Sequence, residues 1–230
     1  MPPLSSLSWT ATEHLRASVL VVPIGATEQH GPHLPLTTDS DIAQALVDGL
    51  CNLDVVIAPV VAFGSSGEHQ SFAGTLSVGQ DALEGYLVEL GRSATCTWDR
   101  IVFVCTHGGN RDAVARASRR LRGEGCDARV WAPRWGGDAH AGRTETSLML
   151  AIDPERVDVG ASATGITEPL EQLMPLLARH GVASVSTNGV LGDPSGASAT
   201  EGKQLLAAAS ASLSELIAHW PPAEAPDVEA

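Results

Sequence analysis

The stretch Ser18-Val-Leu-Val-Val-Pro-Ile24, followed by Gly25-Ala-Thr-Glu28-Gln-His30-Gly-Pro-His33-Leu-Pro-Leu-Thr-Thr-Asp39, joins an apolar run to a loop rich in acid and histidine side chains. The apolar run predicts a buried β-strand that breaks at its proline and glycine. In open α/β folds, ligands bind beyond the carboxyl ends of the strands. Carboxylate and imidazole ligands together suit zinc, iron or manganese. The stretch therefore predicts an α/β fold with a metal site where a strand ends.

Apolar runs of this kind alternate along the chain with segments that carry leucine and alanine at helical spacing. Strands are predicted at 19–24, 55–61, 100–105 and 128–132, and helices at 39–51, 79–98, 110–125 and 198–220. Such alternation implies a largely parallel sheet that is covered on both faces. We therefore expect a three-layer α/β/α sandwich with a mostly parallel sheet, formed as a single domain by residues 1–220. The last residues, 221–230, have little to bury and predict a disordered tail.

Composition narrows the class of function. The chain has 230 residues, of which 43% are hydrophobic, and a formal net charge of -13 at pH 7. This charge argues against binding to nucleic acid or to an anionic membrane, and leaves small molecules, peptides and proteins as partners. The four cysteines show no CxxC pairing and the N-terminus lacks a signal-peptide pattern, so we expect a cytoplasmic protein. No apolar stretch approaches the roughly 20 residues that span a bilayer.

Two further polar segments stand in the same position relative to predicted strands. Thr106-His107-Gly108-Gly109-Asn110 follows the strand at 100–105, and its glycines permit close approach of an ion or a substrate. We expect Asn110 to cap the helix that begins there. The third segment, Gly136-Gly-Asp138-Ala-His140-Ala-Gly-Arg-Thr144-Glu145, adds a histidine and acids, with Thr144 or Asp138 as a cap for the apolar stretch at 148–152. Three such loops would converge at one edge of a parallel sheet.

Other catalytic chemistries fit the sequence less well. Cys105 ends an apolar strand and is interpreted as a buried structural thiol rather than a nucleophile. The segment Gly64-Ser-Ser-Gly67 lacks the strand-to-helix elbow of a serine hydrolase and the acid and histidine that should follow it. The glycine-rich segments match neither a phosphate loop nor a dinucleotide fingerprint.

Taken together, these segments resemble the creatininase, or creatinine amidohydrolase, family over nearly the whole chain. Several segments, such as Gly67-Glu-His-Gln70 and Gly137-Asp138, are most similar to a peptidase branch that acts on a precursor peptide in the biosynthesis of a redox cofactor. The motifs that carry the resemblance are Glu28-Gln-His30-Gly-Pro-His-Leu-Pro-Leu36, Gly67-Glu-His69-Gln-Ser-Phe72-Ala-Gly-Thr75, His107-Gly-Gly-Asn110, His140-Ala-Gly-Arg-Thr-Glu145-Thr-Ser147 and Gly189-Val-Leu-Gly-Asp-Pro194.

The resemblance implies an amidohydrolase with two divalent metal ions per chain, zinc, iron(II) or manganese(II), that is usually assembled as a homohexamer. Glu28 and His107 match ligands of one metal and His30 matches a ligand of the other. Asp39 matches the carboxylate that bridges both metals.

One ligand position departs from creatininase, which has a glutamate two residues after the histidine matched by His107. This chain has Gly109 there. Glu145 is therefore assigned to complete the second metal site. The pair Cys105-Thr106 also stands where the family often has Asn-Gly, and this departure bears on metal preference.

The remaining assignments concern the substrate. His140 matches a histidine proposed for proton transfer, so it is assigned general acid/base or substrate-orienting work. Glu68 and His69 either line the substrate pocket or form a subunit contact. Two ions about 3.5 to 4 Å apart would lower the pKa of a shared water and supply hydroxide to attack an amide carbonyl.

In the peptidase branch, the implied reaction releases a modified, Val-Tyr-derived dipeptide from the C-terminal end of the precursor peptide. Two alternatives remain open. The same fold and metals could hydrolyse a small cyclic or formylated amide, which a pocket too short for a peptide would favour. The chain could instead be a non-catalytic metal-bearing scaffold or partner protein, for which Gly109 is the best support.

Overall fold

The sheet in the computed structural model consists of four short parallel strands. β1 (Val19–Ile24) is buried along its whole length and lies between β2 (Val55–Ile57) and β3 (Arg100–Cys105), with β4 (Asp127–Trp131) beyond β3. Every neighbouring pair is parallel, which confirms the predicted sheet. The structure describes residues 3–16, 18–51 and 53–220.

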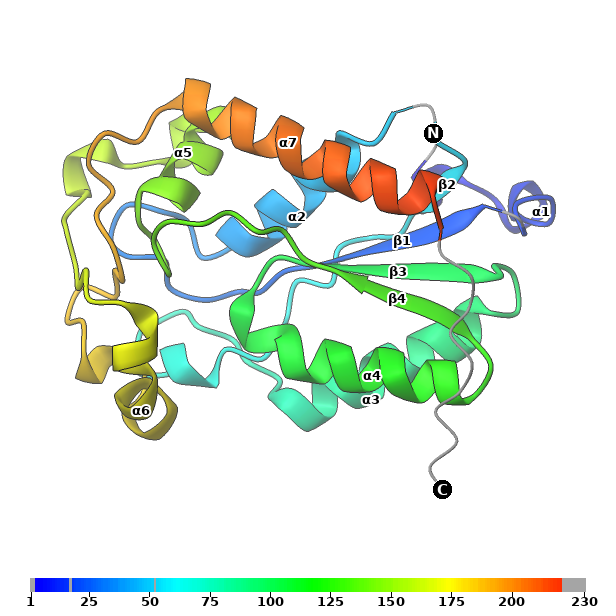
Figure 1. Ribbon diagram of the computed structural model, residues 1–230, viewed down its shortest axis with the longest axis horizontal. Helices are drawn as coiled ribbons and strands as arrows, with labels where there is room; N and C mark the ends of the chain where they lie inside the picture. Colours follow the sequence, from blue (N-terminus) through cyan, green and yellow to red (C-terminus); the bar gives the residue numbers. More distant parts are fainter. Residues whose placement is uncertain (1–2, 17, 52, 221–230) are drawn as a thin grey trace.

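Two pairs of helices cover the two faces of the sheet, so that the molecule has three layers (Figure 1). α3 (Gln80–Ala94) and α4 (Arg111–Gly123) pack against the face that presents Phe103. α2 (Thr38–Asp48) and α7 (Ala199–Ala218) contribute to the core on the opposite face, which presents Val102. Adjacent residues of a strand point to opposite faces, so an uninterrupted apolar strand such as β3 contributes side chains to the cores on both faces. The predicted α/β/α sandwich is confirmed.

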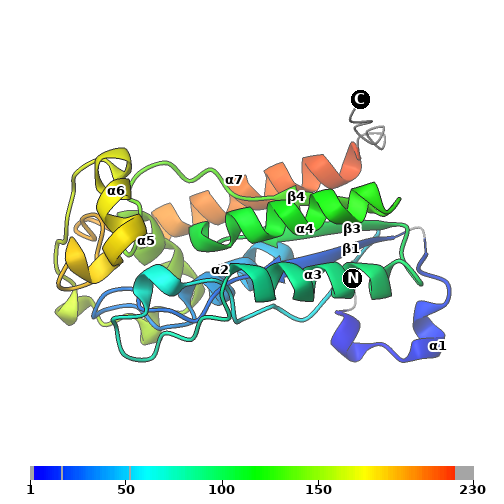
Figure 2. The ribbon, with the colours of Figure 1, turned by 90° about the horizontal axis from the view of Figure 1, so that it is seen from below.

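Two more helices lie at the end of the molecule opposite α1 (Trp9–Thr12), as Figures 1 and 2 show. α5 (Arg143–Ile152) packs along α7, and its Leu148 and Met149 share a third core cluster with Ile42 of α2. α6 (Leu170–His180) contributes Leu173 and Leu177 to a smaller fourth cluster. These helices stand at the carboxyl ends of the strands, where the polar loops emerge.

Some predicted boundaries were wrong for identifiable reasons. β2 ends at Ile57 rather than at Val61, because Pro59 has no N–H to donate, although Val61 returns to bridge Ile24. α6 was not predicted; it holds Pro175 in its interior, which reads as a helix breaker. The expected disordered tail at 221–230 lies outside the described residues.

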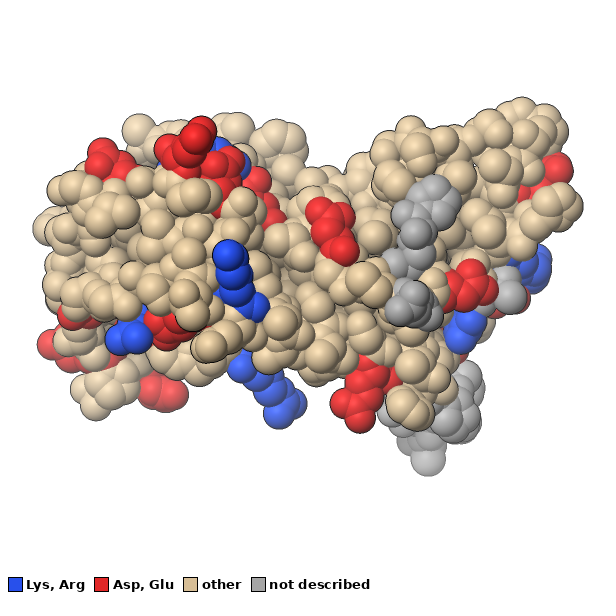
Figure 3. Space-filling view, turned by 90° about the horizontal axis from the view of Figure 1, so that it is seen from above, with Lys and Arg blue, Asp and Glu red and all other residues tan. Residues whose placement is uncertain are grey.

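The surface carries the acidic excess without a continuous basic area on the side of α7, where Lys and Arg side chains stand apart from one another (Figure 3). Within the described ranges, no helix has both the length and the apolar character to cross a bilayer.

Candidate metal centre

Loops from the carboxyl ends of all four strands meet in one place. Because the strands are parallel, these ends share one edge of the sheet. The prediction named the loops after β1, β3 and β4; the structure adds the loop after β2, through the short 3-10 turn η2 (Gly67–His69). In chain order, the side chains brought together are Glu28, His30, Asp39, Glu68, His69, His107, His140 and Glu145.

The loop after β1 is held rigidly, which fixes the positions of its ligand-type side chains. Its ends are tied by a hydrogen bond from the Glu28 amide to the Leu36 carbonyl at 2.9 Å. A Cβ on Gly25 would overlap the Ser40 backbone, so only glycine lets the start of α2 approach so closely. This approach brings Asp39, in the first turn of α2, beside the loop.

Glu28, Asp39 and His107 form the first of two clusters that match the predicted metal sites. His107 Nε2 lies 3.1 Å from Glu28 Oε2, and His107 Nδ1 lies 3.4 Å from Asp39 Oδ2. All three residues are buried.

The second cluster lies on the other side of Asp39. His30 Nε2 is 3.7 Å from Asp39 Oδ2 and 3.8 Å from Glu145 Oε2. The same oxygen of Asp39 therefore faces both clusters. The Ala141 amide donates to Glu145 Oε2 at 2.6 Å, which orients this carboxylate at the start of α5.

Several atoms of these clusters are buried without a hydrogen-bond partner: Glu28 Oε1 and Oε2, His30 Nε2 and Asp39 Oδ2. Leaving a buried polar atom unpaired costs about 1–3 kcal/mol, and more for a charged group. Carboxylate oxygens can only accept, so what would satisfy several of them together is a cation. The residues present therefore fit divalent metal ions.

Hydrogen bonds to main-chain carbonyls fix the ring orientation of three histidines. His30 Nδ1 donates to the Glu28 carbonyl at 3.1 Å, His107 Nε2 to the Ser65 carbonyl at 3.0 Å, and His140 Nε2 to the Gln29 carbonyl at 2.8 Å. A carbonyl only accepts, so each ring carries its proton there and the other nitrogen keeps a lone pair when the ring is neutral. Metal-ligating histidines are held in this way.

The buried charges strongly perturb one another when no cation is bound. Burial raises the pKa of Glu28 to about 8. Burial opposes protonation of His30, but the nearby Asp39 carboxylate outweighs it and raises the pKa of His30 to about 10. Burial would also raise the pKa of Asp39, yet His30 and His107 lower it. In the absence of a metal, a protonated His30 therefore balances the Asp39 carboxylate.

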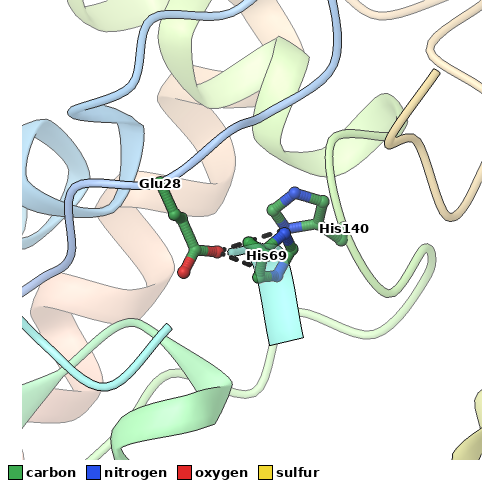
Figure 4. Close-up of side chains that lie close together, drawn as sticks. All are labelled: Glu28, His69 and His140. Carbon is green, nitrogen blue, oxygen red and sulfur yellow. Dashed lines mark ion pairs between the residues drawn. The ribbon is translucent and has the colours of Figure 1, made fainter. Parts of the chain in front are cut away.

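Two further imidazoles, His69 and His140, converge on Glu28 (Figure 4). His69 Nε2 is 3.3 Å and His140 Nδ1 is 3.7 Å from Glu28 Oε1. Burial, reinforced by the neighbouring His107 and His30, lowers the pKa of His69 to about 3. Burial and His30 likewise lower the pKa of His140 well below its usual value. Both rings are therefore neutral near pH 7, and His69 lies within the cluster itself.

Gly109 occupies a position that admits no side chain. A Cβ there would overlap Glu68 Oε1, His107 Nε2 and the Ser65 carbonyl oxygen. The Glu68 carboxylate, 33% exposed, lies 3.7 Å from His107 Nε2 and fills part of this space. The glycine therefore follows from the packing of the loop after β2 against His107.

We predict that Gly109→Ala lowers zinc affinity at least about tenfold, because the added methyl group must displace the ring of a predicted ligand and its carbonyl anchor. Competition with a chromophoric chelator measures this affinity. Gly108→Ala is the matched control, since a Cβ there meets nothing within 4 Å. Equal affinity of the two variants would contradict the prediction.

Other sequence-based expectations for these loops had mixed outcomes. Asn110 occupies the N-cap position of α4, as expected, but its side chain makes no capping hydrogen bond. Its Oδ1 accepts from the Ser65 amide and its Nδ2 donates to the Gly25 carbonyl, which ties three loops together. Asp138 Oδ2 accepts from the Arg143 amide at the start of α5, as one of the two proposed caps. Burial raises the pKa of the Cys105 thiol to about 12, which fits a structural thiol.

Sequence reasoning missed Gln29, whose side chain lies among the histidines. The available signal was its place between two ligand-type residues in a stiff loop. Glu68 and His69, which were predicted to line the substrate pocket or to form a subunit contact, both line a pocket. Because they follow the apolar run of β2, they also lie at the sheet edge where the other loops meet.

The cluster lies at the base of a pocket of about 880 Å³. One wall comes from α6, whose Leu170 and Met174 are 41% and 49% exposed. Arg111 and Arg179 also line the pocket, and both are exposed. The pocket thus combines an apolar wall with positive charge above an acidic, histidine-rich floor.

The chain belongs to the creatininase family of amidohydrolases: the family model described as creatinine amidohydrolase matches residues 5–217. The fold agrees with that of a putative creatinine amidohydrolase from Bacteroides fragilis, with a TM-score of 0.79 at 22% identity, covering 94% of this chain and 95% of the other. Two other similar structures, at 22% and 23% identity, are a zinc–zinc form of a creatininase mutant and a manganese form of creatininase. They have a TM-score of 0.76 and cover 95% of this chain and 98% of theirs.

Relatives of higher identity are peptidases. The chain is 46% identical to the mycofactocin precursor peptide peptidase of Mycobacterium ulcerans over 96% of this chain and 94% of the relative. It is 47% identical to the enzyme of the same name from Mycolicibacterium smegmatis over 91% of this chain and 88% of the relative.

Proposed function

We propose that this protein is a metal-dependent peptidase that releases the modified, Val-Tyr-derived C-terminal dipeptide from the mycofactocin precursor peptide. The observation that carries the proposal is the group of buried, unpartnered acceptor atoms at the base of a large pocket. The peptidases named above, at 46% and 47% identity, support the choice of substrate.

The metal centre is proposed to hold two divalent ions, zinc, iron(II) or manganese(II). Glu28 and His107 would bind one ion, His30 and Glu145 the other, and Asp39 both. This assignment is supported by the two clusters on either side of Asp39 Oδ2. When bound, such ions polarise a carbonyl and activate water at neutral pH.

The residues around the ions move the proton. His140 holds its own proton on Nε2, against the Gln29 carbonyl, so Nδ1 is free to accept one from the attacking water. His140 then delivers that proton to the leaving nitrogen as the C–N bond breaks. The peptide keeps the new carboxylic acid, which loses its remaining proton to bulk water, and the dipeptide-derived product leaves as a neutral amine. Glu68 is proposed to line the substrate path beside His107.

The size and lining of the pocket favour a peptide over a small amide. About 880 Å³ lies near the upper end of the usual range for ligand pockets. The partly exposed Leu170 and Met174 offer an apolar wall for the crosslinked aromatic end of the substrate. A small cyclic or formylated amide would leave this wall unused.

A comparison of three candidate substrates tests the proposal. Metal-loaded protein is incubated separately with the crosslinked precursor peptide, with creatinine and with a formylated amine, and the products are measured by mass spectrometry. Cleavage of the peptide alone is expected. Hydrolysis of a small amide with the peptide intact would show that the protein is a hydrolase of small cyclic or formylated amides. No hydrolysis by fully metal-loaded protein would favour the non-catalytic scaffold.

We predict that metal binding releases protons. The pKa of His30 is about 10, so this ring is protonated at pH 7.5 and must lose a proton to become a ligand. Zinc affinity should therefore rise with pH below about 10, roughly tenfold per unit for each proton displaced. Titration calorimetry in two buffers of different ionisation enthalpy counts the protons; a count of zero at pH 7.5 would contradict this electrostatic account.

The assembly and location are also proposals. We infer a homo-oligomer, a hexamer by family resemblance, which light scattering coupled to size exclusion would test. A cytoplasmic location is supported by the four cysteines, all of which are free.

A further inference from the structure

The side chain of Gln29 is buried between the proposed metal ligands Glu28 and His30, and its amide orientation is determined by two main-chain partners. Gln29 Oε1 accepts from the Gly31 amide at 2.8 Å, and Nε2 donates to the Gly189 carbonyl at 3.0 Å. Exchanging the two atoms would set N–H against N–H and oxygen against oxygen, so the assignment is fixed.

The second N–H of Gln29 Nε2 then has one possible acceptor. Nε2 lies 2.8 Å from His69 Nδ1 and 3.1 Å from His140 Nε2. His140 Nε2 already carries a proton, because it donates to the Gln29 carbonyl at 2.8 Å. The amide therefore donates to His69 Nδ1, which must hold a lone pair.

Because of this contact, the His69 nitrogen that faces the cluster carries a proton, whereas the other three imidazoles present a lone pair there. His30, His107 and His140 each give their proton to a carbonyl and keep a lone pair on the other nitrogen when neutral. Neutral His69 instead carries its proton on Nε2, 3.3 Å from Glu28 Oε1. A protonated nitrogen cannot bind a metal.

We propose that Gln29 is a positioning residue. Its side-chain amide keeps the proton of His69 on Nε2, the nitrogen nearer Glu28, and its main-chain carbonyl keeps the proton of His140 on Nε2. Glu28, His69 and His140 lie close enough together to suggest a cation site of their own, and this tautomer excludes it. The proposal rests on the proposed function, since Glu28 is one of its metal ligands and His140 its proton carrier. His69 then acts on Glu28 electrostatically, because its protonated Nε2 lies 3.3 Å from Oε1 without forming a hydrogen bond to it.

The proposal also gives a role to a motif that the metal centre leaves unused. Gly189 begins the segment Gly189-Val-Leu-Gly-Asp-Pro194 and has a φ of +80°. A Cβ there would overlap Gln29 Oε1. Glycine is therefore required at position 189 both by the positive φ and by the close approach of the Gln29 side-chain amide.

Neutron diffraction from deuterated crystals of the zinc-loaded protein tests the tautomers without any substrate. We expect deuterium on Nε2 of His69 and of His140, and none on Nδ1 of either ring. In crystals of Gln29→Glu, an acceptor replaces the donor, and the deuterium of His69 should move to Nδ1. Deuterium on Nδ1 of His69 in the wild type, or zinc bound to this ring, would overturn the proposal.

Kinetics and zinc affinity provide the second test. Gln29→Glu and Gly189→Ala are expected to lower kcat about 10- to 100-fold, with less than a threefold change in KM, and to weaken zinc binding. Gln44→Met, on the outer side of α2, and Gly196→Ala are the controls. Gly196 has a φ of +74° and meets only the flexible end of Arg143, so it reproduces the backbone strain without touching Gln29. Unchanged kcat and zinc affinity in both test variants would refute the positioning role.

The two tests separate this proposal from the proposed function. If the wild type leaves the precursor peptide intact, the function fails, while the neutron maps and zinc affinities still decide the role of Gln29.

Discussion

Asp39→Asn is expected to remove both metal ions and to lower peptide hydrolysis at least about 10³-fold. Its Oδ2 lies 3.4 Å from His107 Nδ1 and 3.7 Å from His30 Nε2, so one oxygen serves both proposed sites. An amide in its place has no negative charge to share between two cations. Metal catalysis is worth several kcal/mol of transition-state stabilisation, and 1.36 kcal/mol corresponds to a factor of ten.

Metal content by mass spectrometry and product release by liquid chromatography measure the two effects of this variant. Asp48→Asn is the matched control, since it makes the same substitution at an exposed position of the same helix. A variant at position 39 that keeps two ions per chain and full activity would show that Asp39 does not bridge them.

His140→Ala is expected to lower kcat about 10²- to 10⁴-fold, the usual range for loss of a general acid or base. The proton-accepting nitrogen disappears, while the two ligand clusters around Asp39 stay complete. Metal content should therefore remain at two ions per chain, which separates proton transfer from metal binding.

His14→Ala, at an exposed position two residues after α1 and outside the four loops, should keep wild-type activity. If His140→Ala instead loses one ion in proportion to its activity, His140 is a ligand, together with His30 and Glu145, with which it also clusters.

The part of the fold and site that could be predicted from sequence depends on one rule: sites in α/β folds form where loops leave the carboxyl ends of parallel strands. Apolar runs such as Val19–Ile24 and Arg100–Cys105 marked the strands correctly, because a strand buried on both faces needs no polar residue. Parallel strands then bring their following loops to one edge, so Glu28 and His107 could be placed together without knowing any distance.

What the sequence did not reveal depends on contacts between distant segments. Nothing near Asn110 indicates that its side chain would tie Ser65 to Gly25 instead of capping a helix. The role of Gln29 depends on Gly189, which is 160 residues away in the chain. Helix α6 was missed for a local reason instead, because Pro175 in its interior is a typical helix breaker.

The central claim is that this centre uses metal ions to cleave the precursor peptide. The most direct measurement is mass spectrometry of the crosslinked precursor peptide after incubation with four samples: metal-loaded protein, chelated protein, chelated protein with zinc or manganese restored, and metal-loaded Glu145→Gln. We predict release of the Val-Tyr-derived product in the first and third samples, none in the second and little in the fourth. Release by the chelated protein, or an intact peptide with fully metal-loaded protein, would contradict the account.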